Sequence, residues 1–150
     1  MKIYFAGSIS GGRADKELYL LLIQHLTKHG HVLTEHIGDP NLGKAGEDGQ
    51  TDEWIYQRDL EWLEESDVIV AEVSTPSLGV GYEIGRAESM KKPVLCLFRP
   101  RESQRLSAMI AGNPKLETVR YQRLEEAKTL IDHFFATQNS TKETGLPASG

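Results

Sequence analysis

Five short apolar runs alternate along the chain with segments of helical periodicity, and this alternation restricts the possible folds more than any other feature. The runs are KIYFA (2–6), HVLT (31–34), DVIVAEV (67–73), PVLCLF (93–98) and, more weakly, ETVRY (117–121). Strands that are apolar on both faces are typical of a parallel sheet covered by helices on each side. The sequence therefore predicts an α/β fold, a flavodoxin/Rossmann-like five-stranded parallel sheet with helices on both faces. Five strands suggest the order 2-1-3-4-5, although the sequence does not fix it.

The segments between these runs carry helix end signals. Residues 14–30 place apolar side chains at helical spacing and end in glycine, a common stop. Residues 51–66 open with Thr51 and acidic residues, as an N-cap and first turn do. Two further helices are expected over 79–92 and 123–137, and a short one within SQRLSAMIAG (103–112).

A chain of 150 residues fits one compact domain, which we assign to residues 1–136. Residues 137–150 are mostly small or polar and lack periodicity, which predicts a disordered tail. The polar segment 35–50 is long enough to indicate a lid or a binding loop.

Charge and cysteine content exclude several classes of function. The net charge of −5 argues against a nucleic-acid polymer as partner, so an anionic ligand would be small. No apolar run approaches the length that spans a membrane, and no secretion signal opens the chain, so we expect no membrane partner. Cys96 is the only cysteine and lies in an apolar run, which predicts a buried structural thiol in a reducing compartment. The expected location is the cytoplasm, with the nucleus as an additional location.

Ligands of such sheets bind at the carboxyl ends of the strands, near the point where strand order reverses. Residues 7–13 follow the first strand there and read GSISGGR. Their glycines permit close backbone approach, their serines offer hydroxyls, and Arg13 offers a cation, so the segment could cradle a phosphate. The alternative is a flexible turn without a ligand. The residues concerned are Gly7, Ser8, Ile9, Ser10, Gly11, Gly12 and Arg13.

The segment SLGVGYEIGRA (77–87), after the third strand, combines three glycines with one carboxylate, Glu83. Each glycine in a helix interior costs roughly 1 kcal/mol relative to alanine, so we interpret the glycines as room for a ligand. Glu83 is then a candidate catalytic carboxylate. The alternative is an ordinary surface pair between Glu83 and Arg86, three residues on.

Asp59, in the helix before the third strand, is a second candidate acid, since glycosidic chemistry needs two converging carboxylates. An acid at the boundary of a buried helix face is the alternative, and spacing alone does not show that Asp59 and Glu83 meet. His36 could contact a base or a proton, or serve no role. His25, His29 and His31 show no metal-ligand spacing, so we predict no metal and no cofactor.

Several segments, in one register over about residues 3–135, together resemble the 2′-deoxynucleoside 5′-phosphate N-hydrolases of the nucleoside 2-deoxyribosyltransferase superfamily. They are YFAGSISGGR, VLTEH, DLEWLEESDVIVAEVSTPSLGVGYEIGRA, KPVLCLFRP and LSAMIAG. The resemblance implies a homodimeric glycosidase of nucleotide metabolism. It would hydrolyse the N-glycosidic bond of 2′-deoxynucleoside 5′-monophosphates to 2-deoxyribose 5-phosphate and free base.

The same resemblance implies roles for individual residues. Glu83 matches the nucleophile that forms a covalent deoxyribosyl intermediate, Asp59 the acid that contacts the sugar and assists proton movement, and Tyr4 the catalytic tyrosine. His36 matches a residue of the base pocket, and Ser107 a serine donated by the neighbouring subunit. Residues 7–13, Ser77 and Gly79 match the phosphate site.

Ser10 departs from the family pattern, which has arginine there, so the phosphate site would lose one charge-assisted contact. Two other functions remain open. A deoxyribosyltransferase would pass the same covalent intermediate to a second base, and a non-catalytic nucleotide sensor would bind without turnover. The preferred base and the role of the tail are not indicated by the sequence.

Overall fold

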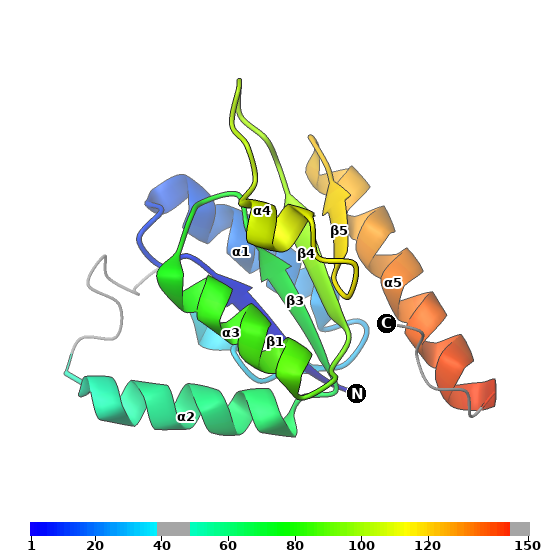
Figure 1. The fold of residues 1–150 in the computed structure, drawn as a ribbon, viewed down its shortest axis with the longest axis horizontal. Coiled ribbons are helices and arrows are strands. Elements are labelled where there is room, and N and C mark those ends of the chain that lie inside the picture. The colour runs from blue at the N-terminus through cyan, green and yellow to red at the C-terminus, as the bar shows by residue number, and fades with distance from the viewer. Residues whose placement is uncertain (39–48, 145–150) are drawn as a thin grey trace.

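Five parallel strands form the centre of the molecule in the order β2-β1-β3-β4-β5 (Figure 1). The computed structural model describes residues 1–38 and 49–144. The strands are β1 (Lys2–Gly7), β2 (His31–Val32), β3 (Val68–Glu72), β4 (Val94–Phe98) and β5 (Glu117–Arg120). The predicted α/β fold is confirmed, and so is the suggested strand order. β1 and β3 lie side by side, and their carboxyl ends mark the point where strand order reverses.

Helices connect the strands and cover both faces of the sheet. They are α1 (Arg13–Leu26), the 3-10 helix η1 (Glu35–Gly38), α2 (Asp52–Glu65), α3 (Leu78–Ser89), α4 (Ala108–Ala111) and α5 (Leu124–Thr144). The predicted N-cap of α2 is present, because the hydroxyl of Thr51 accepts a hydrogen bond from the backbone N–H of Trp54 at 3.1 Å. Ser77 caps α3 in the same way, accepting from the N–H of Val80 at 3.2 Å.

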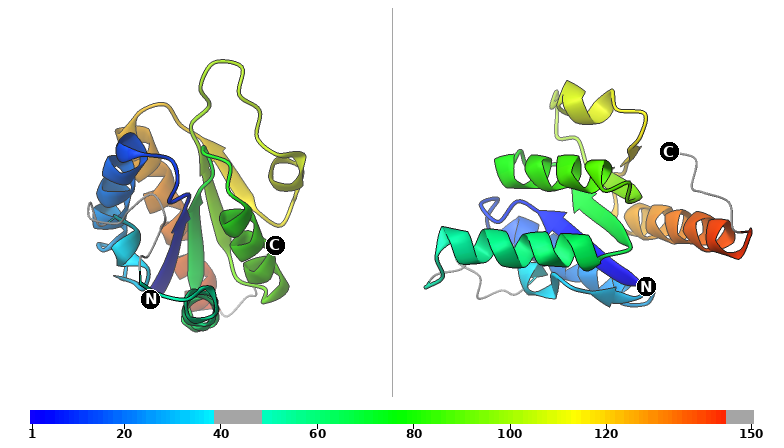
Figure 2. Two further views of the ribbon diagram at one scale, coloured as in Figure 1. Left: turned by 90° about the vertical axis from the view of Figure 1, so that its left-hand side faces the viewer. Right: turned by 60° about the horizontal axis from the view of Figure 1, so that its bottom comes forward.

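The alternation of side chains along the strands divides the core into two clusters, one on each face. On one face, Ile3 and Phe5 of β1 pack with apolar residues of α1 and α5. On the other face, Tyr4 and Ala6 pack with Leu63 of α2 and with α3. Figure 2 shows this layering, with α1 and α5 on one side of the sheet and α3, with α2 beside it, on the other. Because side chains alternate between the two faces along β1, Tyr4 points toward α2 and α3, while its neighbours Ile3 and Phe5 point the other way.

The helix ends differ from the sequence prediction at two places. α1 ends at Leu26, before the glycine that we expected to stop it, and Thr27 is its C-cap. α5 continues to Thr144, so the disordered tail predicted from residue 137 is wrong for 137–144. Within this part of the helix the hydroxyls of Thr137 and Thr141 each donate to the carbonyl four residues earlier, so these polar side chains are paired with the helix backbone. Residues 145–150 lie outside the described part.

The long polar loop predicted over 35–50 is described only at its ends. Its first residues form η1, and residues 39–48 lie outside the described part, so the proposed lid is not tested. Among the helices that the structure describes, none is long and apolar enough to cross a membrane.

Candidate active site

A pocket of about 150 Å³ lies between α2 and α3 and has β1 at its base. Its lining includes Tyr4, Tyr56, Asp59, Gly79, Tyr82 and Glu83. The structure thus brings together three residues predicted from different parts of the chain: Tyr4, Asp59 and Glu83. Small-molecule pockets usually measure about 300–1,000 Å³, so this one is the size of a fragment such as a sugar ring rather than a whole nucleotide.

Glu83 projects from the second turn of α3 into this pocket. Burial is the main cause that raises the pKa of its carboxyl to about 7. A hydrogen bond with Tyr4 opposes this rise, and the nearby charge of Asp59 adds to it. No ion pair joins Glu83 to Arg86 within the described residues; Arg86 instead contacts the hydroxyl of Tyr82 at 3.5 Å. The alternative of a plain surface pair is therefore wrong.

Tyr4 supplies the hydroxyl that faces the Glu83 carboxylate. Its side chain is only 1% exposed, and burial followed by the charges of Glu83 and Asp59 raises the pKa of its hydroxyl far above the usual range. Tyr4 therefore remains a hydrogen-bond donor at every physiological pH. A buried donor of this kind stabilises the ionised form of Glu83, the form that a nucleophile requires.

Asp59 is held by its neighbour Arg58, which the sequence analysis did not single out. The Nε and Nη2 atoms of Arg58 both donate to Oδ1 of Asp59, at 3.0 Å and 2.7 Å. The guanidinium also lies over the rings of Trp54 and Trp62, at 5.0 Å and 4.6 Å from their centroids. These contacts fix Arg58, and through it they fix the direction in which Asp59 faces the pocket.

His36 lies next to this arrangement rather than in the lining of the pocket. Its Nε2 atom is 3.3 Å from Nη2 of Arg58, and its ring lies 5.5 Å from that of Trp62. Arg58 therefore contacts both side chains, and it lies between His36 of η1 and Asp59 of α2.

The loop after β1 follows the carboxyl end of that strand, as the phosphate prediction requires. Gly7 lies directly against Tyr19, since a Cβ there would be 2.8 Å from Cζ of the tyrosine ring. Gly12 has a φ of 89°, a backbone conformation that favours glycine. The hydroxyls of Ser8 and Ser10 are 3.1 Å apart. Space thus favours glycine at Gly7, the end of β1, and backbone conformation favours it at Gly12 in the loop.

The cation near this loop is not where we expected it. Arg13 is 93% exposed at its side chain and pairs with Glu17 at 3.4 Å. Asp15, 4% exposed, lies behind the loop instead and accepts hydrogen bonds from Thr75 at 2.6 Å and from Arg101 at 3.3 Å. Asp15 thereby joins the segments that follow β1, β3 and β4. No sequence pattern identified it, because its partners are distant in the chain.

Ser107 does not line the pocket of Glu83. It is the N-cap of α4, where its hydroxyl accepts from the N–H of Met109 at 3.3 Å. It borders a separate, mostly apolar groove of about 580 Å³ that also includes Ser77, Leu78 and Gly81 of the α3 region. Within this one chain, Ser107 and Glu83 therefore belong to different cavities.

Two other sequence predictions are resolved by the structure. Cys96 is fully buried, and burial raises the pKa of its thiol to about 12, so a structural thiol is confirmed. The statement that the histidines lack metal-ligand spacing is wrong for His25 and His29. His25 lies in the last turn of α1 and His29 in the turn that follows the helix, and both contact Asp132 of α5.

The chain is similar over most of its length to several known proteins. A sequence profile described as nucleoside 2-deoxyribosyltransferase matches residues 3–139. A protein of Tetraodon nigroviridis named 5-hydroxymethyl-dUMP N-hydrolase is 52% identical over 141 residues, covering 92% of this chain and 99% of that protein. A Nematostella vectensis protein is 51% identical over 140 residues, covering 91% and 95% of the two chains. It carries the provisional name 2′-deoxynucleoside 5′-phosphate N-hydrolase 1. The solution structure of BlsM shares the fold, with a TM-score of 0.76 at 24% identity over 99% of this chain and 96% of that one.

Proposed function

Because the chain belongs to the nucleoside 2-deoxyribosyltransferase family, we propose that its pocket hydrolyses the N-glycosidic bond of 2′-deoxynucleoside 5′-monophosphates. The products are 2-deoxyribose 5-phosphate and a free base. The observation that carries the proposal is the convergence of Glu83, Asp59 and Tyr4 on one sugar-sized pocket. Relatives at about half identity are named for 5-hydroxymethyl-dUMP, which makes that nucleotide the first substrate to test.

The first chemical step is attack by a Glu83 carboxylate oxygen on C1′ of the deoxyribose. The C1′–N bond breaks, its electron pair leaves with the base, and the base takes up a proton. Asp59 lines the same pocket and is the acid placed to assist that proton or to hold the sugar hydroxyl. The hydrogen bond from Tyr4 favours the ionised form of Glu83 that the attack requires and holds its orientation.

In the second step, water attacks C1′ and releases Glu83 from the covalent deoxyribosyl ester. Asp59 reverses its role and is placed to accept a proton from the attacking water, as the acid of a retaining glycosidase does in its second step. A pocket of about 150 Å³ accommodates the deoxyribose, so the phosphate and the base extend beyond it. The phosphate then reaches residues 7–13 and the N-terminal end of α3, where Ser77 and Gly79 lie and the helix dipole favours an anion.

The homodimer is part of this proposal. Leu78 is 96% exposed and Met109 80% exposed, and both line the apolar groove beside Ser107. Exposed apolar side chains around a groove are typical of a protein interface. The exposed apolar groove supports the binding of a second copy there, and we propose that this copy contributes its Ser107 to the phosphate end of this chain's pocket.

Substitution of Glu83 by glutamine tests the proposal most directly. We expect Glu83→Gln to keep the fold and to lose turnover of 5-hydroxymethyl-dUMP by at least about 10³-fold, because an amide is a very poor nucleophile. Chromatography of the free base measures the loss, and circular dichroism checks the fold. Glu88→Gln, on the last turn of the same helix, is the matched control and should retain activity. A folded Glu83→Gln protein with near-normal turnover would remove Glu83 from the mechanism.

The same assay separates the two alternatives. With a second free base present, a transferase would form a new nucleotide, whereas the hydrolase forms only 2-deoxyribose 5-phosphate. A nucleotide sensor would release no base even after long incubation. A panel of deoxynucleoside monophosphates in this assay identifies the preferred base.

A further inference from the structure

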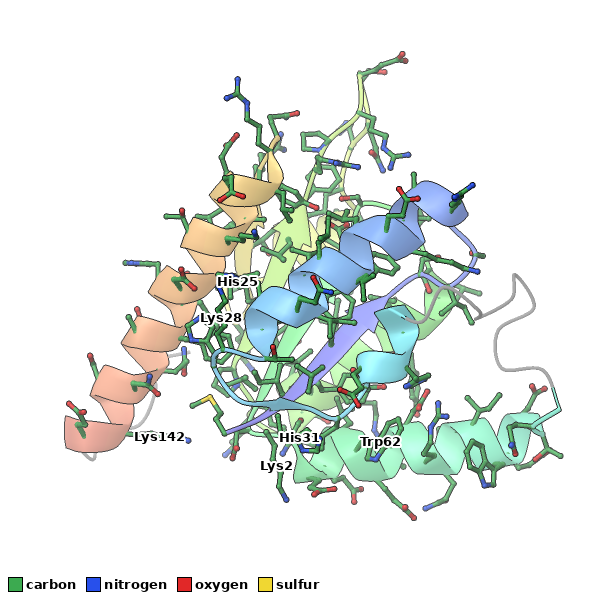
Figure 3. All side chains as sticks on the ribbon, turned by 180° about the vertical axis from the view of Figure 1, so that it is seen from behind. Lys2, His25, Lys28, His31, Trp62 and Lys142 are labelled. Atoms are coloured by element: carbon green, nitrogen blue, oxygen red, sulfur yellow. The ribbon has the colours of Figure 1, made fainter. Side chains whose placement is uncertain are left out.

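His25, His29 and Asp132 meet where the C-terminal end of α1 packs against α5. The Nε2 atoms of His25 and His29 lie 2.6 Å and 2.7 Å from the same oxygen, Oδ1 of Asp132. Figure 3 shows His25 in this position, between the two helices. One ligand atom from each of the three residues lies within 4.8 Å of the others.

Packing already holds both imidazoles in place. The side chain of His25 is 8% exposed, and the ring of His29 stacks on Phe135 with centroids 4.5 Å apart and an interplanar angle of 6°. Asp132 is half exposed at its side chain, so ions and water can reach the cluster. Burial raises the pKa of Asp132, but hydrogen bonds from His29 and His25 outweigh it, and the net shift is downward. The carboxylate is therefore ionised at neutral pH.

We propose that His25, His29 and Asp132 bind a divalent transition-metal ion, and that this ion is Zn²⁺. Two imidazoles and one carboxylate are a donor set that suits zinc, at about 2.0–2.2 Å from each ligand atom. In a tetrahedral site these distances put the ligand atoms roughly 3.4 Å apart, so the cluster needs only a small outward movement of the exposed Asp132. Water would complete the coordination.

The cluster lies away from the pocket of Glu83. α1 runs back from the carboxyl end of β1, so its last turn lies toward the amino ends of the strands. A metal there would join α1 to α5 and stabilise their packing, without taking part in the reaction. The cation would also lie near the C-terminal end of α1, where the helix dipole favours positive charge.

The competing explanation is a plain hydrogen-bonded histidine–aspartate cluster. The Nδ1 atom of His25 is buried and has no hydrogen-bond partner among the described residues. Zinc-bound histidines usually donate this second N–H to a carboxylate or carbonyl, and loss of that contact weakens binding about 10–100-fold. We therefore expect zinc to bind about 10–100-fold more weakly than at a site whose histidines have both ring nitrogens paired.

Isothermal titration calorimetry of the full-length, tag-free protein with ZnCl₂ at pH 7.5 tests the proposal. The absorption spectrum of Co²⁺ bound in place of zinc reports the coordination geometry. We expect one ion per chain, tetrahedral Co²⁺ bands and a rise in melting temperature that EDTA reverses. His29→Gln and Asp132→Asn should each weaken binding at least about tenfold, since each removes one of three ligands. His133→Gln, at the exposed neighbouring position on α5, should bind like the parent chain.

Circular dichroism checks that each variant is folded, and either folded ligand variant is sufficient for the comparison. The proposal is overturned if zinc shows no saturable binding below about 1 mM, or if a folded ligand variant and His133→Gln bind it equally well.

Discussion

At the scale of single residues, the state of Glu83 depends on three opposing influences. Burial raises the pKa of its carboxyl to about 7, Tyr4 opposes the rise by hydrogen bonding, and Asp59 adds to it by charge repulsion. A nucleophile must be ionised, so in the unliganded protein Glu83 is poised near neutrality. Removal of either neighbour should therefore move the pH dependence of activity, and in opposite directions.

We expect kcat/KM of the parent enzyme to fall as the pH drops through about 7, because Glu83 becomes protonated. Tyr4→Phe removes the hydrogen bond that lowers the pKa of Glu83, so its acid limb should move to higher pH. Asp59→Asn removes the charge that raises this pKa, so its acid limb should move to lower pH. The assay is residual hydrolysis of one deoxynucleotide between pH 5 and 9.

The substrate phosphate itself titrates near pH 6, but it does so equally with every variant, so the comparison among variants removes its effect. For variants too slow to assay, ¹³C NMR of the Glu83 carboxyl carbon follows the same pKa. Shifts in the same direction, or no shift in either variant, would contradict the assigned roles of Tyr4 and Asp59.

Some residues of the site could be predicted from the sequence, and others could not, for a physical reason. Glu83 and the loop at 7–13 follow strands, so the rule for ligand position in parallel sheets identifies them. Asp15 acts through the hydroxyl of Thr75, which is distant in the chain and is brought close only by folding, so no local pattern identifies it. Arg58 differs, because Trp54 and Trp62 lie four residues before and after it on the same helix, a local spacing that could have indicated it.

At the scale of elements, the three glycines of α3 turn out to have different surroundings. A Cβ at Gly79 would lie 4.0 Å from Oε1 of Glu83, inside the pocket, whereas nothing lies within 4 Å of a Cβ at Gly81 or Gly85. The interpretation that all three glycines make room for the substrate beside Glu83 is therefore wrong for Gly81 and Gly85, and for Gly79 it stays a prediction. Gly81 borders the groove beside Ser107, and Gly85 lies exposed in the helix interior.

Alanine substitution should separate these positions. Gly85→Ala should raise the free energy of unfolding by about 0.5–1 kcal/mol through helix propensity and leave turnover unchanged. Gly79→Ala should lower kcat/KM, because its methyl group occupies space that the deoxyribose needs next to Glu83. Urea unfolding and steady-state kinetics of the two proteins measure both effects. If Gly79→Ala keeps full activity, the substrate does not approach the start of α3.

The boundaries of elements were predictable where capping side chains mark them and unpredictable where they do not. Thr51 signals the start of α2 in the sequence, and the structure confirms it. α5 has no such stop signal near residue 137. The hydroxyls of Thr137 and Thr141, beyond the predicted end, donate to carbonyls of the preceding turn of the helix. A polar composition alone thus failed to distinguish a solvent-exposed helix from a disordered segment.

At the scale of the whole molecule, the strand order explains why one edge of the sheet carries the chemistry. β1 and β3 are adjacent, so the loop at 7–13 and the start of α3 meet at the same edge although they are about 70 residues apart. Ser107 of the same chain does not lie at this edge, because it caps α4 and borders a separate groove. The apolar side chains around that groove, Leu78 and Met109, are the surface on which a second copy would bind.

A test of the shared site is complementation between two inactive variants. In a twofold dimer each site would combine Glu83 of one chain with Ser107 of the other. A dimer of one Glu83→Gln chain and one Ser107→Trp chain then has one site with both substitutions and one site with neither. Random exchange at equal amounts makes about half of the dimers mixed, so about a quarter of the parent activity should return. Each variant alone should stay inactive, and sedimentation together with exchange of labelled chains verifies the dimers. If the chains exchange and no activity returns, or if the active protein sediments as a monomer, each chain carries a complete site of its own.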